Sequence, residues 1–337
     1  MNLRLRIVIA IVFLALVAWS ASWVFTGDDA PASTAGNAAA DARFRWTSSE
    51  QCRDCHRDVW DEWQGSHHQI AYLNPEVRRL SDDFRNKECQ ACHLPQPIDV
   101  TGFGQRALPR LTRPDQGVDC ITCHVGRNGE VFAAHTVPDA PCRPVTDARF
   151  TSMKLCESCH NQHQTTDQWR ASPFAARGVD CNDCHMPDVD RKLADGRVRV
   201  GRGHRYPGAH DEAMLRKAGK FEARVEGREF VAVLLNDGAG HNFPTEERHR
   251  AVDIEWRAID AQGQAGAWTR AFRFRQPYRE EPGENTQLPA GERREVRVTL
   301  PEGTAKVGVR LWYRLNPFAV DGDAASTLLE EREVIVP

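Results

Sequence analysis

The sequence predicts an α+β multidomain protein, in which a mostly α-helical domain with long loops precedes an all-β sandwich-like domain. The pattern Cys-x-x-Cys-His occurs five times between residues 46 and 215, where aliphatic residues are sparse. From about residue 220, apolar and polar residues alternate in several runs, as in β-strands with one buried face. No cysteine follows Cys184, so the two regions depend on different stabilising forces.

The N-terminal segment, 1–26, has the composition of an export signal or a membrane anchor. Arg4 and Arg6 precede a mostly apolar stretch, 7–25. Both a cleaved signal peptide and an uncleaved anchor are open, and we favour the anchor because the stretch nearly spans a bilayer. Either one places the rest of the chain on the periplasmic side of the cytoplasmic membrane. The small, polar residues 27–45 predict a flexible linker.

Short helices are expected between the repeats of the first domain, 46–215. The apolar residues of 57–73 fall on one helical stripe. A second helix is expected in 74–84, with Asn74 as its N-cap and Pro75 at its first position.

The second domain, 220–337, is expected to contain six or seven strands. Turn signals containing glycine separate the alternating runs. This spacing is typical of a β-sandwich. The expected strand regions are 221–237, 251–260, 269–276, 293–301, 306–315 and 332–337.

The repeated pentapeptide is the attachment site of c-type haem. Two thiols bond the porphyrin, and the histidine that follows is placed as the proximal iron ligand. The haem faces would then replace the aliphatic core that the first domain lacks. The predicted attachment cysteines are Cys52, Cys55, Cys89, Cys92, Cys120, Cys123, Cys156, Cys159, Cys181 and Cys184, and the predicted proximal ligands are His56, His93, His124, His160 and His185.

Structural zinc and disulfides are the competing interpretations of these cysteines. Zinc would pair two Cys-x-x-Cys units, which leaves one of five units without a partner. Neither interpretation explains a histidine after every second cysteine. We therefore expect five covalently bound haem c groups. Cys142, outside the repeats, is expected as a free thiol, with an axial thiolate or an intermolecular disulfide as alternatives.

The five motifs and the segment "EWQGSHH" (62–68) resemble multihaem cytochromes c. That family includes the tetrahaem electron carrier of hydroxylamine oxidation and the ammonia-forming pentahaem nitrite reductases. "CHMP" (184–187), "GHRYPGAHD" (203–211) and "GAGHNFPT" (238–245) are also similar to stretches in such cytochromes. The first domain is thus expected to be a multihaem cytochrome c domain.

The resemblance implies a distal ligand at His68, the last residue of a Trp-x-x-Ser-x-His signature, with His67 as the fallback. "QWRASPF" (168–174) has the same frame, but Phe174 replaces the histidine. The further distal candidates are the loop residues His204 and His210, then His241, and finally His163 and His135. Near His241, Gly238 and Gly240 would allow the backbone to approach a haem edge closely.

Three functions are compatible with these residues. A haem with two axial histidines only exchanges electrons, which favours a periplasm-facing carrier between redox partners, for example a membrane quinol-oxidising enzyme and a periplasmic acceptor. An open haem would instead support an oxidoreductase acting on a nitrogen or sulfur oxyanion. The nitrite reductases mark their catalytic haem with lysine, whereas all five motifs here end in histidine. A haem filament is a third possibility.

Nucleic acid is not expected as a partner. The formal net charge of the chain is −3, so there is no basic excess to attract phosphates.

Overall fold

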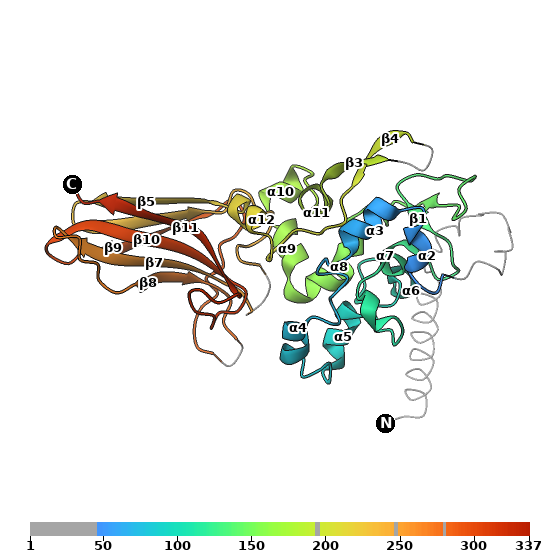
Figure 1. Cartoon of the computed structure of the whole chain (residues 1–337), viewed down its shortest axis with the longest axis horizontal. Helices are drawn as coiled ribbons and strands as arrows, with labels where there is room; N and C mark the ends of the chain where they lie inside the picture. The colour runs from blue at the N-terminus through green and yellow to red at the C-terminus, as the bar shows by residue number, and fades with distance from the viewer. Residues whose placement is uncertain (1–45, 193–195, 246–248, 279–280) are drawn as a thin grey trace, which may run out of the picture. The chain divides into compact units, whose positions relative to one another are not determined.

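The computed structural model describes residues 46–192, 196–245, 249–278 and 281–337. The expected signal or anchor and the linker lie outside the described residues. Within the described ranges, no helix is long and apolar enough to cross a membrane. Residues 46–337 form one compact unit, with short helices in its earlier part and long strands in its later part (Figure 1).

The earlier part consists mainly of short helices and loops, as predicted. Two small sheets accompany them: β1 (Phe132–Ala133) pairs in parallel with β2 (Val145–Thr146), and β3 (Asp188–Lys192) forms a hairpin with β4 (Val198–Arg202). The helices are α2 (Glu50–Arg53), α3 (Arg57–Trp63), α4 (Pro75–Leu80), α5 (Lys87–His93), α6 (Ile98–Thr101), η1 (Pro114–Gln116), α7 (Cys120–His124), α8 (Lys154–His160), η2 (Asn161–His163), α9 (Thr165–Arg170), α10 (Pro173–Ala176), α11 (Cys181–His185) and α12 (Glu212–Lys217).

The predicted helix over 57–73 is shorter than expected. Helix α3 ends at Trp63 because the next residue is extended, with ψ 125°, and Gly65 has φ +79°. The helix predicted in 74–84 begins as expected: the Asn74 side chain accepts hydrogen bonds from two backbone N–H groups of α4, whose first residue is Pro75.

Each Cys-x-x-Cys-His motif lies at a short helix. Helices α5, α7, α8 and α11 end at the motif histidine, whereas in the first motif α2 ends at Arg53 and His56 is the N-cap of α3. Helices α7 and α11 both begin after the sequence Gly-Val-Asp. Asp119 and Asp180 form capping boxes at these two helix starts, which satisfy backbone N–H groups that the helix leaves unpaired.

Two tryptophans attach to the segments before these capped helices in the same way. Trp63 Nε1 donates to Val118 O at 2.9 Å, and Trp169 Nε1 donates to Val179 O at 2.9 Å. The same two valines donate back through their N–H groups, Val118 to His68 O at 2.8 Å and Val179 to Phe174 O at 3.0 Å. These matching bonds define two equivalent modules: the first contains α2, α3 and α7, and the second contains α8, α9, α10 and α11.

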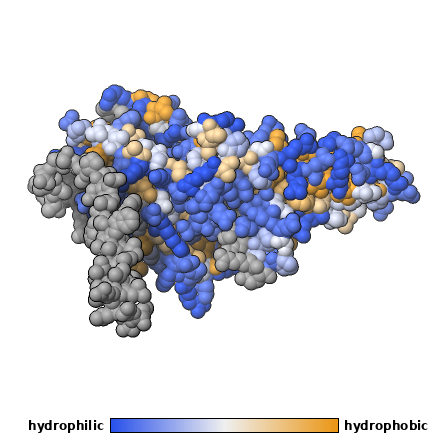
Figure 2. All heavy atoms as spheres, turned by 180° about the vertical axis from the view of Figure 1, so that it is seen from behind, coloured by the Kyte–Doolittle hydropathy of each residue, from blue (hydrophilic) through white to orange (hydrophobic). Residues whose placement is uncertain are grey.

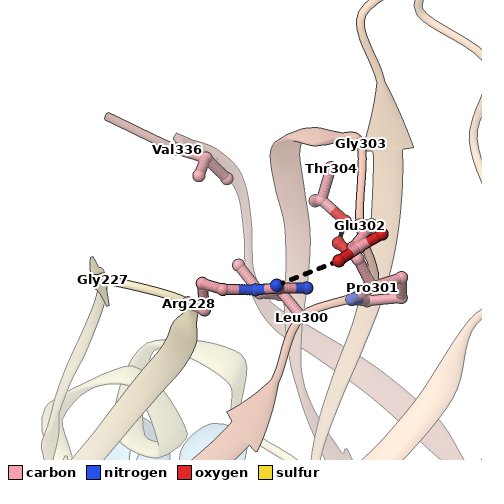
Figure 3. A pocket seen from close by; sticks show the side chains of 8 residues that line it. All are labelled: Gly227, Arg228, Leu300, Pro301, Glu302, Gly303, Thr304 and Val336. Atoms are coloured by element: carbon pink, nitrogen blue, oxygen red, sulfur yellow. Dashed lines mark hydrogen bonds and ion pairs between the residues drawn. The ribbon is translucent and has the colours of Figure 1, made fainter.

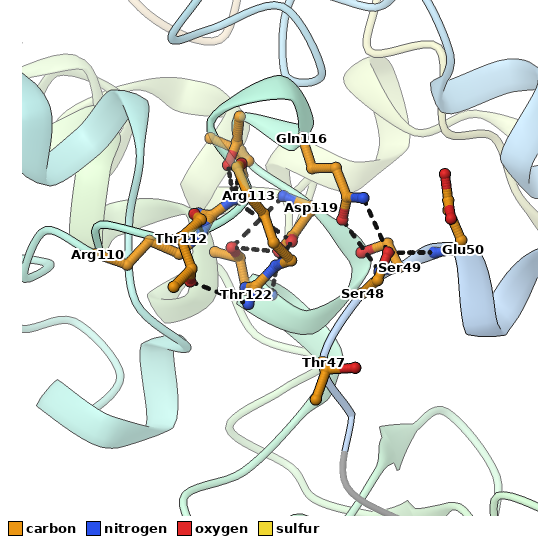
Figure 4. Close-up of polar contacts among 12 residues, drawn as sticks. Thr47, Ser48, Ser49, Glu50, Arg110, Thr112, Arg113, Gln116, Asp119 and Thr122 are labelled. Atoms are coloured by element: carbon orange, nitrogen blue, oxygen red, sulfur yellow. Dashed lines mark hydrogen bonds and ion pairs between the residues drawn. The ribbon is translucent and has the colours of Figure 1, made fainter.

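A buried ion-pair network supports α7 in the first module (Figure 4). The fully buried Asp119 accepts from Arg113 Nε at 2.8 Å and from Arg110 Nη2 at 3.4 Å. Arg110 also donates to the backbone carbonyls of Pro95, Thr112, Arg113 and Gly117. The charge of Asp119 is therefore balanced inside the protein, and the loop before α7 is held at several points.

The later part of the chain is a two-sheet β structure. One sheet has the order β11-β10-β7-β8 and the other β5-β6-β9, and all their pairs are antiparallel. Side chains of both sheets, among them Phe230, Val252, Ile254 and Val307, share one hydrophobic core. The strands are β5 (Lys220–Glu226), β6 (Glu229–Leu235), β7 (Ala251–Asp260), β8 (Thr269–Phe274), β9 (Arg293–Thr299), β10 (Thr304–Arg314) and β11 (Ser326–Ile335).

The number of strands in 220–337 agrees with the prediction, with two differences in their bounds. The run expected in 221–237 is a hairpin of two strands, β5 and β6, because Gly227 turns the chain with φ +59°. The strand expected at 332–337 is the end of the longer strand β11. The proposed domain boundary between 215 and 220 stays a prediction.

The surface of the described part is mainly hydrophilic on the face shown in Figure 2, with hydrophobic residues gathered in small patches. The exposed large apolar residues include Val198 and Val200 of β4, and Phe318 and Val320 in the β10–β11 connection. Val198 and Val200 belong to one short strand, and Phe318 and Val320 belong to one loop; small exposed apolar groups of this size are ordinary on protein surfaces.

The buried charge of Asp119 predicts a difference in stability between two capping aspartates. Asp119→Ala leaves the 5 %-exposed Arg110 side chain without its carboxylate, so we expect a loss of about 3–5 kcal/mol. Asp180→Ala removes only a helix cap and should cost about 1 kcal/mol. Denaturant unfolding of the two variants measures the difference, and equal losses would contradict the role assigned to the ion pairs.

Candidate haem-binding site

Three motif histidines each face a second histidine across a similar distance. In every pair one member follows a Cys-x-x-Cys unit and the other was predicted as a distal ligand. The pairs and the separations of their ring centroids are His160 with His68 at 6.2 Å, His124 with His204 at 6.3 Å, and His185 with His241 at 6.2 Å.

These separations fit an iron between the two rings of each pair. A metal–imidazole bond is about 2 Å long. Two imidazoles bound through Nε2 on opposite sides of one iron therefore have centroids about 6 Å apart. Direct ring stacking would bring the centroids much closer.

Hydrogen bonds at Nδ1 prepare several of these rings for ligation. Because a carbonyl oxygen can only accept, the Nδ1 atom that contacts it carries the proton and Nε2 keeps its lone pair for a metal. Five predicted ligands have such a bond, at 2.7–3.0 Å: His93 to Ala71 O, His124 to Phe132 O, His185 to Pro207 O, His204 to Arg202 O and His241 to Asn242 O.

Burial keeps the three distal candidates neutral. It lowers the pKa of His68 to about 3 and the pKa values of His204 and His241 to about 4, because a charged imidazolium is poorly solvated there and other histidines lie nearby. A neutral imidazole is the form that binds iron.

Thiols of different motifs contact one another in pairs. A hydrogen bond with Cys120 is the main cause that raises the pKa of Cys52, and a bond with Cys156 does the same for Cys181. In both modules, therefore, the first cysteines of the two motifs meet. A third contact, which raises the pKa of Cys159, joins it to Cys92 of the second motif.

His67 and His210 lie together but cannot share an iron. Their rings stack with centroids 3.7 Å apart, which leaves no room for a metal between them. His67 and His68 therefore point in different directions. His68 faces His160 and also contacts Tyr206, with centroids 4.1 Å apart.

The two weaker candidates, His135 and His163, are not brought to a motif histidine by any ring contact that the structure records among the described residues. His135 is exposed in the loop after β1. His163 ends η2, and its Nδ1 is buried without a hydrogen-bond partner. Their role as ligands stays a prediction, as does that of His210.

Cys142 lies near the first motif. Burial is the main cause that raises its pKa, and the Cys55 thiol contributes to the rise. The free thiol expected from the sequence stays a prediction, as do its alternatives.

Gly238 and Gly240, near His241, allow their loop to pack closely against neighbouring parts of the chain. A Cβ atom at Gly238 would lie 1.7 Å from Lys217 O, and one at Gly240 would lie 3.4 Å from the Phe174 Cβ and Trp169 Cδ1 atoms. Close approach to a haem edge, expected from the sequence, stays a prediction. The glycines let the loop with His241 pack against the second module.

Sequence reasoning missed the polar residues that hold the distal ligands. Glu62 accepts a bond from His204 N at 2.8 Å, and Gln168 accepts one from Asn242 N at 3.3 Å. Both residues directly precede a tryptophan of the repeated Trp-x-x-Ser frame. That repeated position was the available signal in the sequence.

A surface hollow at one end of the β structure is separate from these residues (Figure 3). It is lined by the β5–β6 and β9–β10 turns and crossed by an ion pair of Arg228 with Glu302 at 3.3 Å. Its lining has no cysteine or histidine, so it has no part in the predicted site.

Known proteins support this interpretation of the motifs. Residues 51–125, which include the first three motifs, match the family model described as cytochrome c554 and c-prime. The crystal structure of a penta-heme cytochrome c552 from Thermochromatium tepidum is similar, with a TM-score of 0.63 and 20% sequence identity. The match covers 86% of this chain and 98% of that chain, so it extends well beyond the motif region.

These matches support a multihaem cytochrome c family. The resemblance found in the sequence is thereby confirmed, and haem c is supported as the cofactor. The putative ApaA protein from Bordetella pertussis aligns with 35% of this chain and 92% of its own, at 15% identity and a TM-score of 0.20, which is too low to carry an argument. No curated protein matches the sequence.

The paired histidines predict a spectroscopic result for three single variants. His68→Ala, His204→Ala and His241→Ala should each convert one low-spin ferric haem to high spin, because one iron loses an axial imidazole. Electron paramagnetic resonance of the oxidised protein measures the change. His249→Ala, whose ring contacts Tyr278 instead, is the control and should leave the spectrum unchanged. An unchanged spectrum in the first three variants would contradict the assignment.

Proposed function

We propose that this chain is a pentahaem c-type cytochrome that transfers electrons between redox partners. The main support is the set of three histidine pairs whose ring centroids are 6.2–6.3 Å apart. In each pair both axial positions of one iron would belong to the protein. Such a site exchanges electrons and excludes substrate from the metal.

The donor set suits haem c better than zinc. Haem c supplies one-electron chemistry through its iron. The cysteines of each motif would attach the group and the following histidine would hold its iron. A structural zinc site needs four gathered ligands, and the described side chains include no cluster of three or more His, Cys, Asp or Glu that could hold a metal.

The contacts between motifs support a continuous path for electrons. Cys52 with Cys120 joins the first motif to the third, Cys156 with Cys181 joins the fourth to the fifth, and Cys92 with Cys159 joins the second to the fourth.

Tyr206 connects the two modules. Its ring centroid is 4.1 Å from that of His68, which faces the fourth motif, and 5.8 Å from that of His204, which faces the third. All five attachment sites therefore form one connected array, which branches at the fourth motif and ends at the first, second and fifth motifs.

The connected array and the N-terminal segment support a proposal for the location and the redox partners of the protein. We propose a position on the periplasmic side of the cytoplasmic membrane, with the chain either anchored or released after signal cleavage. A membrane quinol-oxidising enzyme would supply electrons and a periplasmic acceptor would take them. The export-like composition of 1–26 supports this location, because a segment of that kind directs the rest of the chain out of the cytoplasm.

Three measurements on one sample of the purified protein test the proposal: its mass, its ferric spin state and its binding of carbon monoxide. The mass of the purified protein should exceed that of its polypeptide by five haems. The oxidised protein should give only low-spin ferric signals, and the reduced protein should form no carbon monoxide adduct. A mass without added haem would refute the proposal. Five haems with one high-spin signal and a carbon monoxide adduct would support the alternative, an oxidoreductase acting on a nitrogen or sulfur oxyanion.

A further inference from the structure

The residue before each repeated tryptophan holds the segment that carries a distal histidine. In the first module, Glu62 Oε2 accepts from the backbone N–H of His204 at 2.8 Å. In the second, Gln168 Oε1 accepts from the backbone N–H of Asn242, next to His241, at 3.3 Å. The two modules thus use the same position for the same task, once with a charged side chain and once with a neutral one.

Glu62 acts together with a buried arginine of the β3–β4 hairpin. Arg191 donates to both Glu62 oxygens, at 2.8 and 2.5 Å, and the side chains of the two residues are only 10 % and 15 % exposed. Arg191 belongs to the inward face of β3, where it alternates with the exposed Asp190 and Lys192. A bidentate pair with this little exposure has a fixed geometry and is weakly screened.

Arg191 also contacts the carbonyl oxygen to which the His204 ring donates its hydrogen bond. Arg191 Nη2 donates to Arg202 O at 2.7 Å, and His204 Nδ1 donates to that oxygen at 2.9 Å. The carbonyl oxygen is therefore shared between a cation and the imidazole. Sharing makes it a weaker acceptor for Nδ1–H, so the His204 ring gives less electron density to a metal on Nε2.

The second module has no such charge at the corresponding position. Gln168 Oε1 accepts from Thr245 Oγ1 at 2.8 Å in addition to Asn242 N. Thr245 in turn contacts Thr165 of α9 at 2.9 Å between their hydroxyl oxygens. These neutral bonds attach the loop of His241 to the helix that carries Trp169.

We propose that the side chain before each repeated tryptophan, Glu62 in the first module and Gln168 in the second, positions the distal-ligand segment and makes the reduction potentials of the two equivalent haems different. The inference rests on the proposed haem binding. Glu62 and Gln168 act through the histidine segments and are positioning residues.

The charges determine the sign of each expected change. Glu62→Gln keeps an acceptor oxygen but leaves Arg191 uncompensated, and a nearby positive charge favours the ferrous state, so the potential of the His124/His204 haem rises. Gln168→Glu adds a negative charge beside His241, so the potential of the His185/His241 haem falls. Neutralising Arg191 together with Glu62 should return the first potential towards the wild-type value.

Redox titration followed by electron paramagnetic resonance tests these signs in the holoprotein. Each of the two signals is assigned by its loss in His204→Ala or His241→Ala. We expect each single variant to change the ratio of oxidised to reduced haem about tenfold at a fixed solution potential, equivalent to about 59 mV for one electron. The other haems should keep their potentials.

Asp188→Asn is the matched control. Asp188 pairs with Arg202 at 3.2 Å on the same hairpin, but it is 68 % exposed, so its loss should leave all potentials unchanged. Unchanged potentials in Glu62→Gln and Gln168→Glu, or shifts of equal sign, would overturn the proposal. The haem mass is measured on the same samples, so a missing haem, which would refute the proposed function, is distinguished from a failure of this inference.

Discussion

The bond from a tryptophan indole to the carbonyl before a capped motif helix organises the haem-binding region. Trp63 and Trp169 each donate to the valine that precedes an Asp-Cys pair, at 2.9 Å. One such bond contributes only about 1 kcal/mol net. Its structural effect is larger, because it fixes one motif helix against the segment that follows another motif. The first cysteines of the two motifs then meet, and the residue before the tryptophan reaches a distal-ligand segment.

The two regions of the chain are stabilised by different forces. The β structure has a core of fully buried aliphatic and aromatic side chains, such as Phe230, Phe274 and Val309, which both sheets share. In the motif region the largest buried side chains are few, and buried polar groups such as Asp119 and Arg110 take their place beside them. A polar network of this kind specifies position more than it adds stability. It suits a region that must hold ligands at defined distances from one another.

The sequence predicted the features that depend on local patterns. Alternation of apolar residues located the strands, and the fixed spacing of the five motifs located the cysteines and the histidines that follow them. The histidine pairs could not be derived from the sequence, because His68 and His160, or His185 and His241, meet only through tertiary contacts. The helix over 57–73 was overestimated because its apolar stripe continues past Gly65, where the backbone turns. The ion pair of Glu62 with Arg191 joins residues 129 positions apart, and no local pattern indicates it.

The equivalence of the two modules explains why one Trp-x-x-Ser frame ends in histidine and the other in phenylalanine. Val118 and Val179 donate to the carbonyls of His68 and Phe174, so these two residues occupy the same backbone position. In the first module that position faces His160, a motif histidine of the second module. In the second module the same position lies against Gly240 of the β region, where no motif histidine follows in sequence. The Phe174 ring packs there against protein, at a lower desolvation cost than an imidazole would have. The exchange of histidine for phenylalanine therefore marks the point at which the second module packs against the loop that carries His241.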